Sequence, residues 1–342
     1  MENKNNNQVI NESELGILLT LDKNQQRTIT KAIGIGGGGI NAVNCMYQNI
    51  DGVNFVVLDS DRQQLIESPV PNRMLLIPNT THRSAAEESE ADIAALFDDD
   101  TKMVIIVAGM GGETGTDTAP VVARIAREKG LLTIGIVTIP FLFEGSQKIL
   151  KALKGAEDMG EYVDALFIID NRHLTEIYND LDQTNTFIKA DETLTTVVRS
   201  IRDLTIPKGP ASYDFNDLNT TLRKGGNAII NSGYAVGEHR VTKAIENALE
   251  SPLLKNCDIY SSKKVWLTLY YNPDSESPLR MSELNEVHEF MTHFDQDPDV
   301  IWIPDHDRTL DNQLKVTVLA SGFNVSYKSD LKPLKDSLSQ NG

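Results

Sequence analysis

The sequence predicts an α/β fold with three layers, in which a mostly parallel sheet is followed by a smaller α+β unit. Short runs of almost wholly apolar residues recur through the first half, at residues 32–35, 53–58, 74–77, 103–108, 132–139 and 165–169. Strands buried on both faces have this composition. Segments with helical spacing lie between them, at residues 41–48, 84–97 and 121–129. Strands that alternate with helices predict a parallel sheet with helices on both faces.

A long helical pattern at residues 187–204 divides the chain, and Pro-Lys-Gly-Pro at residues 207–210 ends it. The remainder has two helical patterns, at residues 241–249 and 281–294. It also has three strand-like runs, at residues 265–271, 300–303 and 314–319. We therefore expect a polar extension at residues 1–28 and a first domain at residues 29–186. A central helix with its exit follows at residues 187–210, then a second domain at residues 211–325 and a polar tail at residues 326–342. Residues 15–21 of the extension could form one short strand.

The composition excludes several classes of protein. Asp and Glu number 49 against 32 Lys and Arg, a net charge of −17, so the phosphates of nucleic acid or anionic lipid would be repelled. The apolar runs are far shorter than the roughly 20 residues of a membrane span, and residues 1–10 lack the apolar core of a secretory signal. Two distant cysteines, Cys45 and Cys257, and six histidines argue against a disulfide framework or a zinc enzyme, and for a reducing cytoplasm. We expect Cys45, Trp266 and Trp302 in the core.

A glycine-rich stretch follows the first predicted strand and opens the next helix, with the sequence Gly34-Ile35-Gly36-Gly37-Gly38-Gly39-Ile40-Asn41. Glycines let the backbone approach a phosphate closely, and a helix start offers unpaired N–H groups to an anion. The spacing also satisfies the dinucleotide pattern G-x-G-x-x-G, and Asp59 ends the next strand where a ribose-binding acid would lie. From these residues alone, an NAD-dependent oxidoreductase and a tight turn without a ligand both remain open.

A second glycine-rich loop follows the predicted strand at residues 103–108, and it runs through residues 109–120 into a helix. A dinucleotide fold has no standard use for a second loop of this kind, whereas a nucleoside triphosphate held from two sides does. No histidine lies in a recognisable acid–base site. The two loops together therefore favour a triphosphate-binding protein over an oxidoreductase.

Within the second loop, the residues Gly111-Gly112-x-Thr114-Gly115-Thr116 closely resemble GGGTGTG, the signature loop of the tubulin/FtsZ superfamily. The resemblance extends over roughly residues 30–325 and includes the segments 140–145, 214–217 and 251–254, in the family's order and at about its spacing. The chain is thus identified as a divergent member of the bacterial cell-division branch, the FtsZ family. This resemblance implies a Rossmann-type GTP-binding domain, a central helix and a smaller α+β C-terminal domain. It also implies GTP or GDP as the ligand, with Mg²⁺ as a further candidate.

The resemblance implies which residues hold the nucleotide. Asp191 falls where the family reads guanine, and a carboxylate accepts hydrogen bonds from guanine N1–H and N2–H₂, donors that adenine does not offer. Phe187 would stack on the base, Asn171 would contact it, and Glu144 would hold the ribose. Lys148 replaces the usual Arg, which is not equivalent. The residues implied at the phosphates are Gly36, Gly37, Gly38, Gly39, Asn41, Gly111, Gly112, Thr114, Gly115 and Thr116. Taken singly, Phe187 could be a core residue, and Asp191 and Lys148 could lie on solvated helix faces.

The chain departs from the family pattern at the phosphates. Glu113 and Asp117 occupy glycine positions of the signature, and a carboxylate about 5 Å from a phosphate repels it by roughly 3 kcal/mol at an effective dielectric of 20. Such a carboxylate could also cap the helix and fill the anion site itself, turn toward solvent, or be bridged by Mg²⁺. Residues 78–84 lack the glycines of the family's phosphate-sensing loop, and the positive charge of Arg83 could compensate for their loss. Asp59 stands where the family usually has a residue with an amide side chain.

The segment Ser212-Tyr213-Asp214-Phe215-Asn216-Asp217 resembles the family loop that reaches into the nucleotide site of the next subunit. Asp214 and Asp217 match the two acids that position and polarise the attacking water, so hydrolysis would require assembly. Ser212 replaces an Asn, which could leave the γ-phosphate unsupported and weaken the GTPase. Asp214 as the N-cap of a following helix is compatible with this role.

Two functions follow. In the first, the protein polymerises head to tail into protofilaments in bacterial cell division and hydrolyses GTP on assembly. In the second, it is a degenerate paralogue that binds nucleotide weakly or not at all, and co-assembles with or regulates another FtsZ. Both imply a cytoplasmic protein at the division site, without nucleic-acid or direct membrane binding. An NAD-dependent oxidoreductase built on Gly34–Gly39 and Asp59 is the remaining alternative.

Overall fold

The computed structural model describes residues 19–20, 28–76, 87, 89–178, 182–206, 213–251 and 254–325. The chain divides into two compact units, Met1–Val163 with Phe187–Thr195 and Asp164–Thr186 with Thr196–Gly342. Each unit is described by itself below. The predicted loop at residues 78–84, Ser212, part of the segment 251–254, nearly all of the extension and the polar tail lie outside the described residues.

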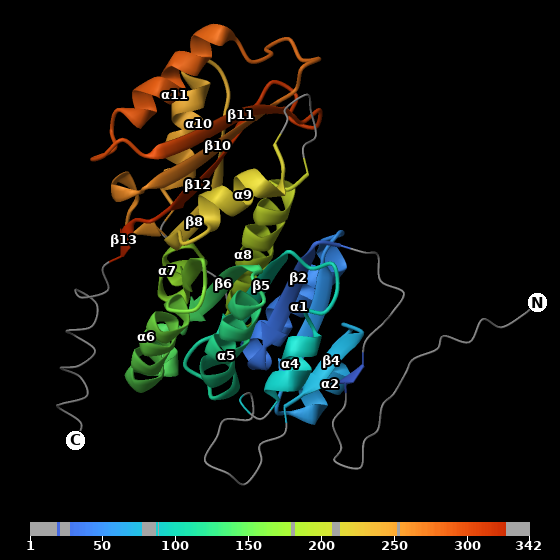
Figure 1. The fold of residues 1–342 in the computed structure, drawn as a ribbon. Coiled ribbons are helices and arrows are strands. Elements are labelled where there is room, and N and C mark those ends of the chain that lie inside the picture. Colours follow the sequence, from blue (N-terminus) through green and yellow to red (C-terminus); the bar gives the residue numbers. More distant parts are fainter. Residues whose placement is uncertain are drawn as a thin grey trace, which may run out of the picture. The chain divides into compact units, whose positions relative to one another are not determined.

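The first unit is built on a sheet with the strand order β1-β4-β3-β2-β5-β6 (Figure 1). Its strands are β1 (Leu19–Thr20), β2 (Thr30–Ile35), β3 (Asn54–Asp59), β4 (Asn72–Leu75), β5 (Met103–Gly109) and β6 (Leu132–Ile139). All neighbours pair in parallel except β1, which is antiparallel to β4. β2 and β5 are buried along nearly their whole length, as their apolar sequences predict. Because the strands are parallel, β2, β3 and β5 end at the same edge of the sheet.

Helices follow the strands of the first unit. They are α1 (Gly36–Asn49), α2 (Arg62–Glu67), α4 (Glu90–Ala95), α5 (Thr114–Glu128) and α6 (Ser146–Gly160), with the 3₁₀ turn η1 at Leu142–Glu144. α1 packs on β2, β3 and β5, whereas α5 packs on β5, β6 and α6. α8 (Gln183–Asp203) begins four residues before the predicted start, because the Asp182 side chain accepts a hydrogen bond from Asn185 N and caps it.

The second unit has the strand order β7-β8-β12-β10-β11. The strands are β7 (Ala165–Asp170), β8 (Gly226–Ala235), β10 (Lys264–Tyr271), β11 (Asp299–His306) and β12 (Leu314–Ser321), and β9 (Cys257–Asp258) pairs separately with β13 (Asn324–Val325). The other regular elements are α7 (Asn171–Ile177), α9 (Phe215–Leu222), α10 (Arg240–Leu249), α11 (Leu284–Met291), η3 (Ile259–Ser261) and η4 (Met281–Glu283). β8 and β10 are antiparallel to β12, whereas β11 is parallel to β10 and forms the edge of the sheet. The parallel first sheet and the mixed second sheet confirm the predicted fold class.

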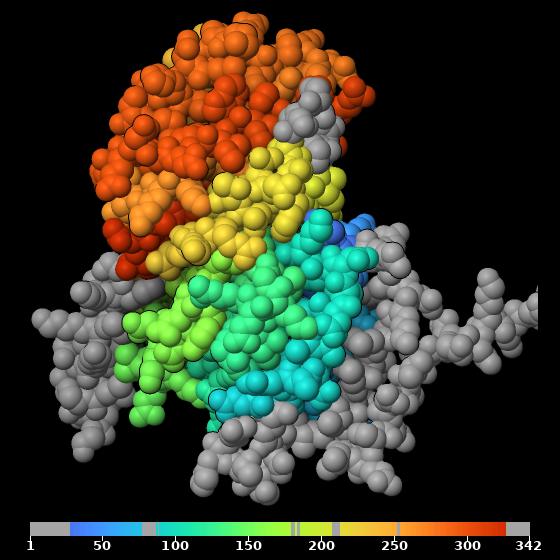
Figure 2. Space-filling model, in the orientation of Figure 1, coloured from blue at the N-terminus to red at the C-terminus, as the bar shows by residue number. Residues whose placement is uncertain are grey.

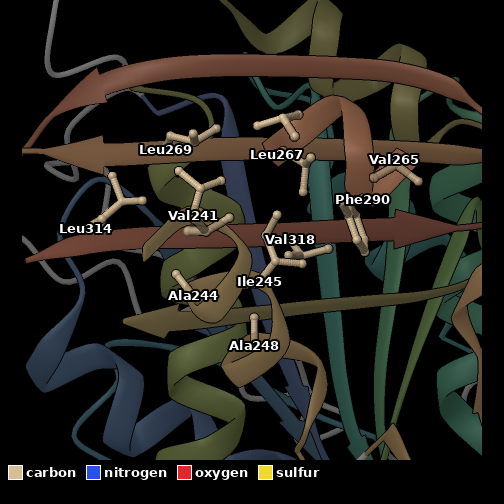
Figure 3. Close-up of a cluster of buried hydrophobic side chains, with 12 residues drawn as sticks. Val241, Ala244, Ile245, Ala248, Val265, Leu267, Leu269, Phe290, Leu314 and Val318 are labelled. Carbon is tan, nitrogen blue, oxygen red and sulfur yellow. The ribbon is translucent and has the colours of Figure 1, made fainter. Parts of the chain in front are cut away.

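The core of the second unit lies between α10, α11 and the inner face of its sheet (Figure 3). The α10 residues Val241, Ala244 and Ile245 are almost completely buried, and their i, i+3, i+4 spacing places them on one helical face. Figure 3 shows this face against Leu267 and Leu269 of β10. A helix of small and β-branched residues can approach the strands closely, which gives the sheet a rigid backing.

The two tryptophans differ in burial. Trp266, in central strand β10, is fully buried, as predicted. Trp302 is 44% exposed, so its prediction as a core residue was wrong. It lies on the edge strand β11, which has a neighbour on one side only. Cys45 is half-buried on α1. Of the helices in the described ranges, none combines the length and the apolar character that crossing a membrane requires.

Candidate functional site

The first glycine-rich loop brings α1 unusually close to the strands beneath it. Gly36 begins the helix with a φ of +68°, which favours glycine. A Cβ atom on Gly39 would lie 2.3 Å from the Val107 carbonyl oxygen, and one on Gly34 would lie 2.5 Å from the Gly39 carbonyl oxygen. Ile35, the N-cap residue of α1, makes no side-chain capping bond, and the first turn of the helix carries no acid. The N–H groups of this turn are therefore arranged to receive an anion.

The second loop lies directly beside the first. A Cβ on Gly36 would meet Gly115 N at 3.0 Å, and one on Gly38 would meet the Gly109 Cα at 3.3 Å. The Thr116 hydroxyl accepts a hydrogen bond from Gly111 N at 2.9 Å and so closes the loop onto the first turn of α5. Thr114 and Ser60, which follows β3, are joined through their hydroxyl oxygens at 3.1 Å.

The glycines of the second loop differ in what surrounds them. Gly111 has a φ of +97°, and a Cβ on it would lie 2.7 Å from the Lys148 carbonyl oxygen. Gly112 is exposed, and a Cβ on it would meet no atom of the described residues within 4 Å. The structure thus brings together the glycines and threonines predicted at the phosphates, and leaves open space at Gly112. Asn41, predicted with them, lies exposed on α1.

Three acids stand near this end of the sheet. Glu113 and Asp117 are both exposed at the start of α5, and Glu113 is the N-cap residue without a side-chain capping bond. Of the alternatives that the sequence left open for these two acids, the structure has Glu113 turned to solvent and not capping the helix. Asp59, only 3% exposed, accepts from Asp61 N through Oδ1, whereas its Oδ2 has no partner in the described part of the chain. Buried polar atoms are usually hydrogen-bonded, so Asp59 Oδ2 points to a ligand, an ion or water.

An aromatic cluster lies at the start of α8. Phe141, fully buried, stacks on Phe143 with ring centroids 5.1 Å apart, and both rings meet Phe187 edge to face. Phe187 is nevertheless 39% exposed. A partly exposed ring whose edge is fixed by two neighbours can offer a face to a planar base. The simpler interpretation of Phe187 as a core residue does not agree with this exposure.

Asp191 follows Phe187 by one helical turn and is half-buried. Its carboxylate has no partner among the described residues, and burial raises its pKa from 3.8 to about 7. An unpaired, partly desolvated carboxylate is costly for the free protein, and two hydrogen-bond donors placed opposite it would remove that cost. Asp191 therefore fits a base that carries two adjacent N–H donors.

Glu144 and Lys148 are paired with each other. Glu144 Oε1 accepts from Phe141 N at 2.9 Å, and its Oε2 forms an ion pair with the Lys148 ammonium group. The pair fixes the Glu144 carboxylate beside the aromatic cluster. Among the described residues, each carboxylate oxygen has one partner, so it retains a lone pair that a ribose hydroxyl could use.

Asn171 belongs to the second unit, where it opens α7. It is 6% exposed, and its Oδ1 has no partner in the described part of the chain. Asp170 before it caps the helix through Arg172 N and also binds the Arg172 guanidinium. The backbone at Asn171 is thus held firmly, while its amide oxygen is left for a ligand or water.

Asp214 and Asp217, in the second unit, form a reciprocal capping box at the start of α9. The Asp214 Oδ1 accepts from Asn216 N at 2.7 Å, and Asp217 Oδ2 accepts from Asp214 N at 2.9 Å. Asp214 is exposed and Asp217 is half-buried. The predicted N-cap role of Asp214 is confirmed, and the box holds the two carboxylates in fixed positions near the protein surface.

Two sets of residues around these sites escaped the sequence analysis. Gln64 of α2 lies against the first loop, since a Cβ on Gly37 would be 2.9 Å from its Oε1. Tyr213, beside Asp214, is buried and hydrogen-bonded to the buried Asp305. The one sequence feature that could have pointed to this hydrogen bond is the acid at position 305, which continues an apolar, strand-like run.

Family models match both parts of the chain. The model described as "Tubulin/FtsZ family, GTPase domain" matches residues 29–179. The model described as "FtsZ family, C-terminal domain" matches residues 226–324. The two matches lie in the family's order. They exclude the alternative in which the first glycine-rich loop belongs to an NAD-dependent oxidoreductase.

Individual relatives agree. The cell division protein FtsZ of Porphyromonas gingivalis is 44% identical over 323 residues, which cover 91% of this chain and 70% of the relative. FtsZ of Rickettsia bellii is 36% identical over 317 residues, which cover 89% of this chain and 68% of that relative. Among solved structures, an FtsZ dimer from M. jannaschii matches with a TM-score of 0.73 and 31% identity, covering 87% of this chain and 89% of that one. TubZ of Bacillus thuringiensis serovar israelensis, at 12% identity and a TM-score of 0.75, covers 92% and 91% and shares the fold.

Proposed function

The chain belongs to the FtsZ family of cell division proteins, and on that premise we propose that it assembles head to tail with copies of itself and hydrolyses GTP on assembly. It acts at the division site, and a second FtsZ of the same cell is a further candidate partner. The observation that carries this proposal is the capping box of Asp214 and Asp217, which holds two carboxylates in a fixed arrangement at the start of α9. Figure 2 shows α9, in yellow, at the surface of the face in view.

The two glycine-rich loops hold the phosphates in this proposal. Backbone N–H groups at the starts of α1 and α5 donate to the phosphate oxygens, and the open space at Gly112 lets one approach closely. Phe187 stacks on guanine, Asp191 contacts its edge, and Glu144, fixed by Lys148, binds the ribose.

A cation would complete the phosphate end. Mg²⁺ supplies positive charge against the phosphates, and it commonly binds through one or two carboxylates together with phosphate oxygens. Asp59, whose buried Oδ2 lacks a partner in the described part of the chain, is the residue that would hold it. Within the described ranges, no three His, Cys, Asp or Glu side chains group as for a metal ion.

Asp214 and Asp217 orient the attacking water in this proposal. Each accepts a hydrogen bond from it through a carboxylate oxygen, and their negative charge polarises the water toward attack. The acids act on the nucleotide of the neighbouring subunit, so turnover depends on assembly. That a relative from M. jannaschii is described as an FtsZ dimer supports contact between copies.

The test measures GTP turnover against protein concentration. We expect little turnover per subunit at low concentration and a steep rise above a threshold, because each active site needs residues from two copies. Sedimentation of polymer should rise at the same threshold, and ATP should not replace GTP. Turnover per subunit that stays constant at every concentration would contradict the proposal, as would its absence in sedimented polymer.

Glu113 and Asp117 favour a second candidate, a degenerate paralogue with weak nucleotide binding. Both are exposed at the start of α5, where each would repel a triphosphate through solvent. The double variant Glu113→Gln/Asp117→Asn should bind GTP about 3- to 10-fold more tightly at low salt, with a smaller gain at high salt. Titration calorimetry at two salt concentrations measures both affinities.

Glu157→Gln, which neutralises an exposed acid elsewhere in the first unit, is the matched control and should change GTP affinity little. Measurable GTP binding by the double variant alone would favour the degenerate paralogue. Equal affinities of the wild type and the double variant at both salt concentrations would contradict the assigned electrostatic role.

A further inference from the structure

Tyr213 directly precedes Asp214, and it is buried, with 4% of its surface exposed. Its hydroxyl donates to Asp305 Oδ2 at 2.9 Å. Asp305, on β11, is fully buried, and its Oδ1 accepts from His306 N at 2.8 Å. A buried carboxylate is tolerated only where hydrogen bonds replace water, so the bond from the Tyr213 hydroxyl helps to stabilise the buried Asp305. The pair therefore holds Tyr213 firmly against the sheet.

The ring of Tyr213 is fixed as well as its hydroxyl. It meets the fully buried Trp266 edge to face, with ring centroids 5.7 Å apart. The Tyr270 hydroxyl is a further hydrogen-bond partner, and burial raises the pKa of the Tyr213 hydroxyl far above its usual range. Tyr213 thus remains a hydrogen-bond donor throughout the neutral pH range. Trp266 and Tyr270 both belong to β10, the strand beside β11.

The fixed residue is one peptide bond away from the capping box. The backbone N–H of Asp214 donates to Asp217 Oδ2, and the Asp214 side chain caps α9. The other end of α9 is also attached to the sheet, since Ser321 Oγ donates to the Thr221 carbonyl oxygen at 3.1 Å and Lys264 donates to the Thr220 carbonyl oxygen. Both ends of the short helix are therefore attached to the same sheet. Tyr213 provides the attachment at the end that carries Asp214 and Asp217.

We propose that Tyr213 is a positioning residue, whose hydrogen bond to Asp305 sets where Asp214 and Asp217 stand when they meet the nucleotide of the next subunit. The inference rests on the proposed function of these two acids. Because Tyr213 is buried, it acts on the nucleotide site through the backbone of Asp214. Catalytic groups must be placed to within a fraction of an ångström, and an error of about 1 Å can cost about 100-fold in rate.

The variant Tyr213→Phe removes the hydroxyl and keeps the ring on Trp266. We expect kcat in sedimented polymer to fall about 10- to 100-fold, with GTP affinity unchanged within about twofold. Asp305→Asn should retain most of the activity of the wild type, because an amide can still hydrogen-bond both the Tyr213 hydroxyl and His306 N. A packing role for Tyr213 predicts full activity of Tyr213→Phe, and this result would overturn the proposal.

Tyr271→Phe is the matched control. Tyr271 lies beside Tyr270 on β10, and its hydroxyl contacts Nε2 of His306, the neighbour of Asp305, at 3.2 Å. This variant loses one hydroxyl contact to the same edge strand, but away from the Asp214 backbone, and should keep its turnover. An equal loss in both variants would assign the effect to general loosening of the sheet and would overturn the proposal.

Hydrogen exchange tests the attachment without any GTP hydrolysis. The amides of Asp214 and Asn216, which both donate within the capping box, should exchange at least about tenfold faster in Tyr213→Phe than in the wild type or Tyr271→Phe. If the wild type fails to hydrolyse GTP but this difference is found, the proposed function fails while the attachment stands. Unchanged exchange at these two amides would overturn the proposal whatever the turnover.

Discussion

Replacing Asp214 and Asp217 together by asparagine is expected to lower GTP turnover in polymer about 100- to 1,000-fold while GTP binding is retained. Loss of one preorganised electrostatic group in an active site has effects of this size. Asparagine is as good an N-cap as aspartate, so the start of α9 should keep its structure. The variant therefore removes charge from the site without removing the capping box.

Phosphate release from sedimented polymer, together with GTP affinity by calorimetry, measures this effect. Asp258→Asn, an exposed acid of the same unit, is the matched control and should keep its turnover. Retention of more than about a tenth of the turnover by the double variant would contradict the role of the acids as the main water-orienting groups.

Mixing two inactive variants tests whether the acids act between subunits. Asp191→Ala should bind GTP poorly but keeps both acids, whereas the double asparagine variant keeps the base-binding residues. In a head-to-tail polymer, acids of the first variant face nucleotide held by the second, so the mixture should regain part of the activity. Failure of co-sedimented mixtures to regain any activity would place the acids in the same subunit as the nucleotide that they act on.

Asparagine at position 191 is expected to stabilise the free protein at alkaline pH and to remove the pH dependence of GTP binding. Burial raises the Asp191 pKa from 3.8 to about 7, so ionisation in the folded protein costs free energy. This cost is absent below about pH 4, grows as the pH rises and is complete above about pH 7. The difference of about 3 pKa units corresponds to at most about 4 kcal/mol.

Chemical unfolding at pH 5 and pH 8 measures the expected difference. The gain in stability of Asp191→Asn over the wild type should be larger at pH 8 than at pH 5. Glu192→Gln, at the neighbouring exposed position on α8, should show no such gain. A gain that is equal at both pH values would contradict the raised pKa.

Guanine binding should strengthen as the pH rises, whereas the stability of the free protein should fall. The ionised Asp191 can accept two hydrogen bonds, whereas the neutral acid uses one oxygen as a donor. GTP affinity of the wild type should therefore fall as the pH drops below about 7, and that of Asp191→Asn should be nearly constant. Asp191→Ala should lose affinity about 100-fold, in keeping with the loss of a buried, paired acceptor. Calorimetry with GTP and ATP at two pH values separates these outcomes.

The parts of the fold that the sequence predicted well were those with an unambiguous periodicity. The predicted strand at residues 132–139 matches β6 in full, and that at 103–108 differs from β5 by one residue. β8 was not predicted, because its sequence mixes Gly, Asn and Ser with apolar residues and shows no alternation. Pairing with β12 along its length stabilises this strand, and such long-range pairing is not visible in a local pattern.

The candidate site was likewise predictable only in part. Glycine spacing gave both loops, because backbone approach requires glycine whatever the rest of the fold does. The directions of the Glu113 and Asp117 side chains were left open, since the spacing of residues says nothing about where a flexible carboxylate points. The Tyr213–Asp305 bond joins residues 92 positions apart, so only the folded chain brings its two ends together.

The contrast between Gly39 and Gly112 bears on how this motif would change in descendants of the protein. A side chain at position 39 would collide with the Val107 carbonyl oxygen, so selection for folding alone preserves that glycine even in a lineage that has abandoned GTP. No atom of the described residues would collide with a side chain at position 112, so in the proposed function it is the phosphates of the ligand that require its glycine. Drift at position 112, with position 39 unchanged, would be the mark of a lineage that keeps the filament architecture and has given up the nucleotide.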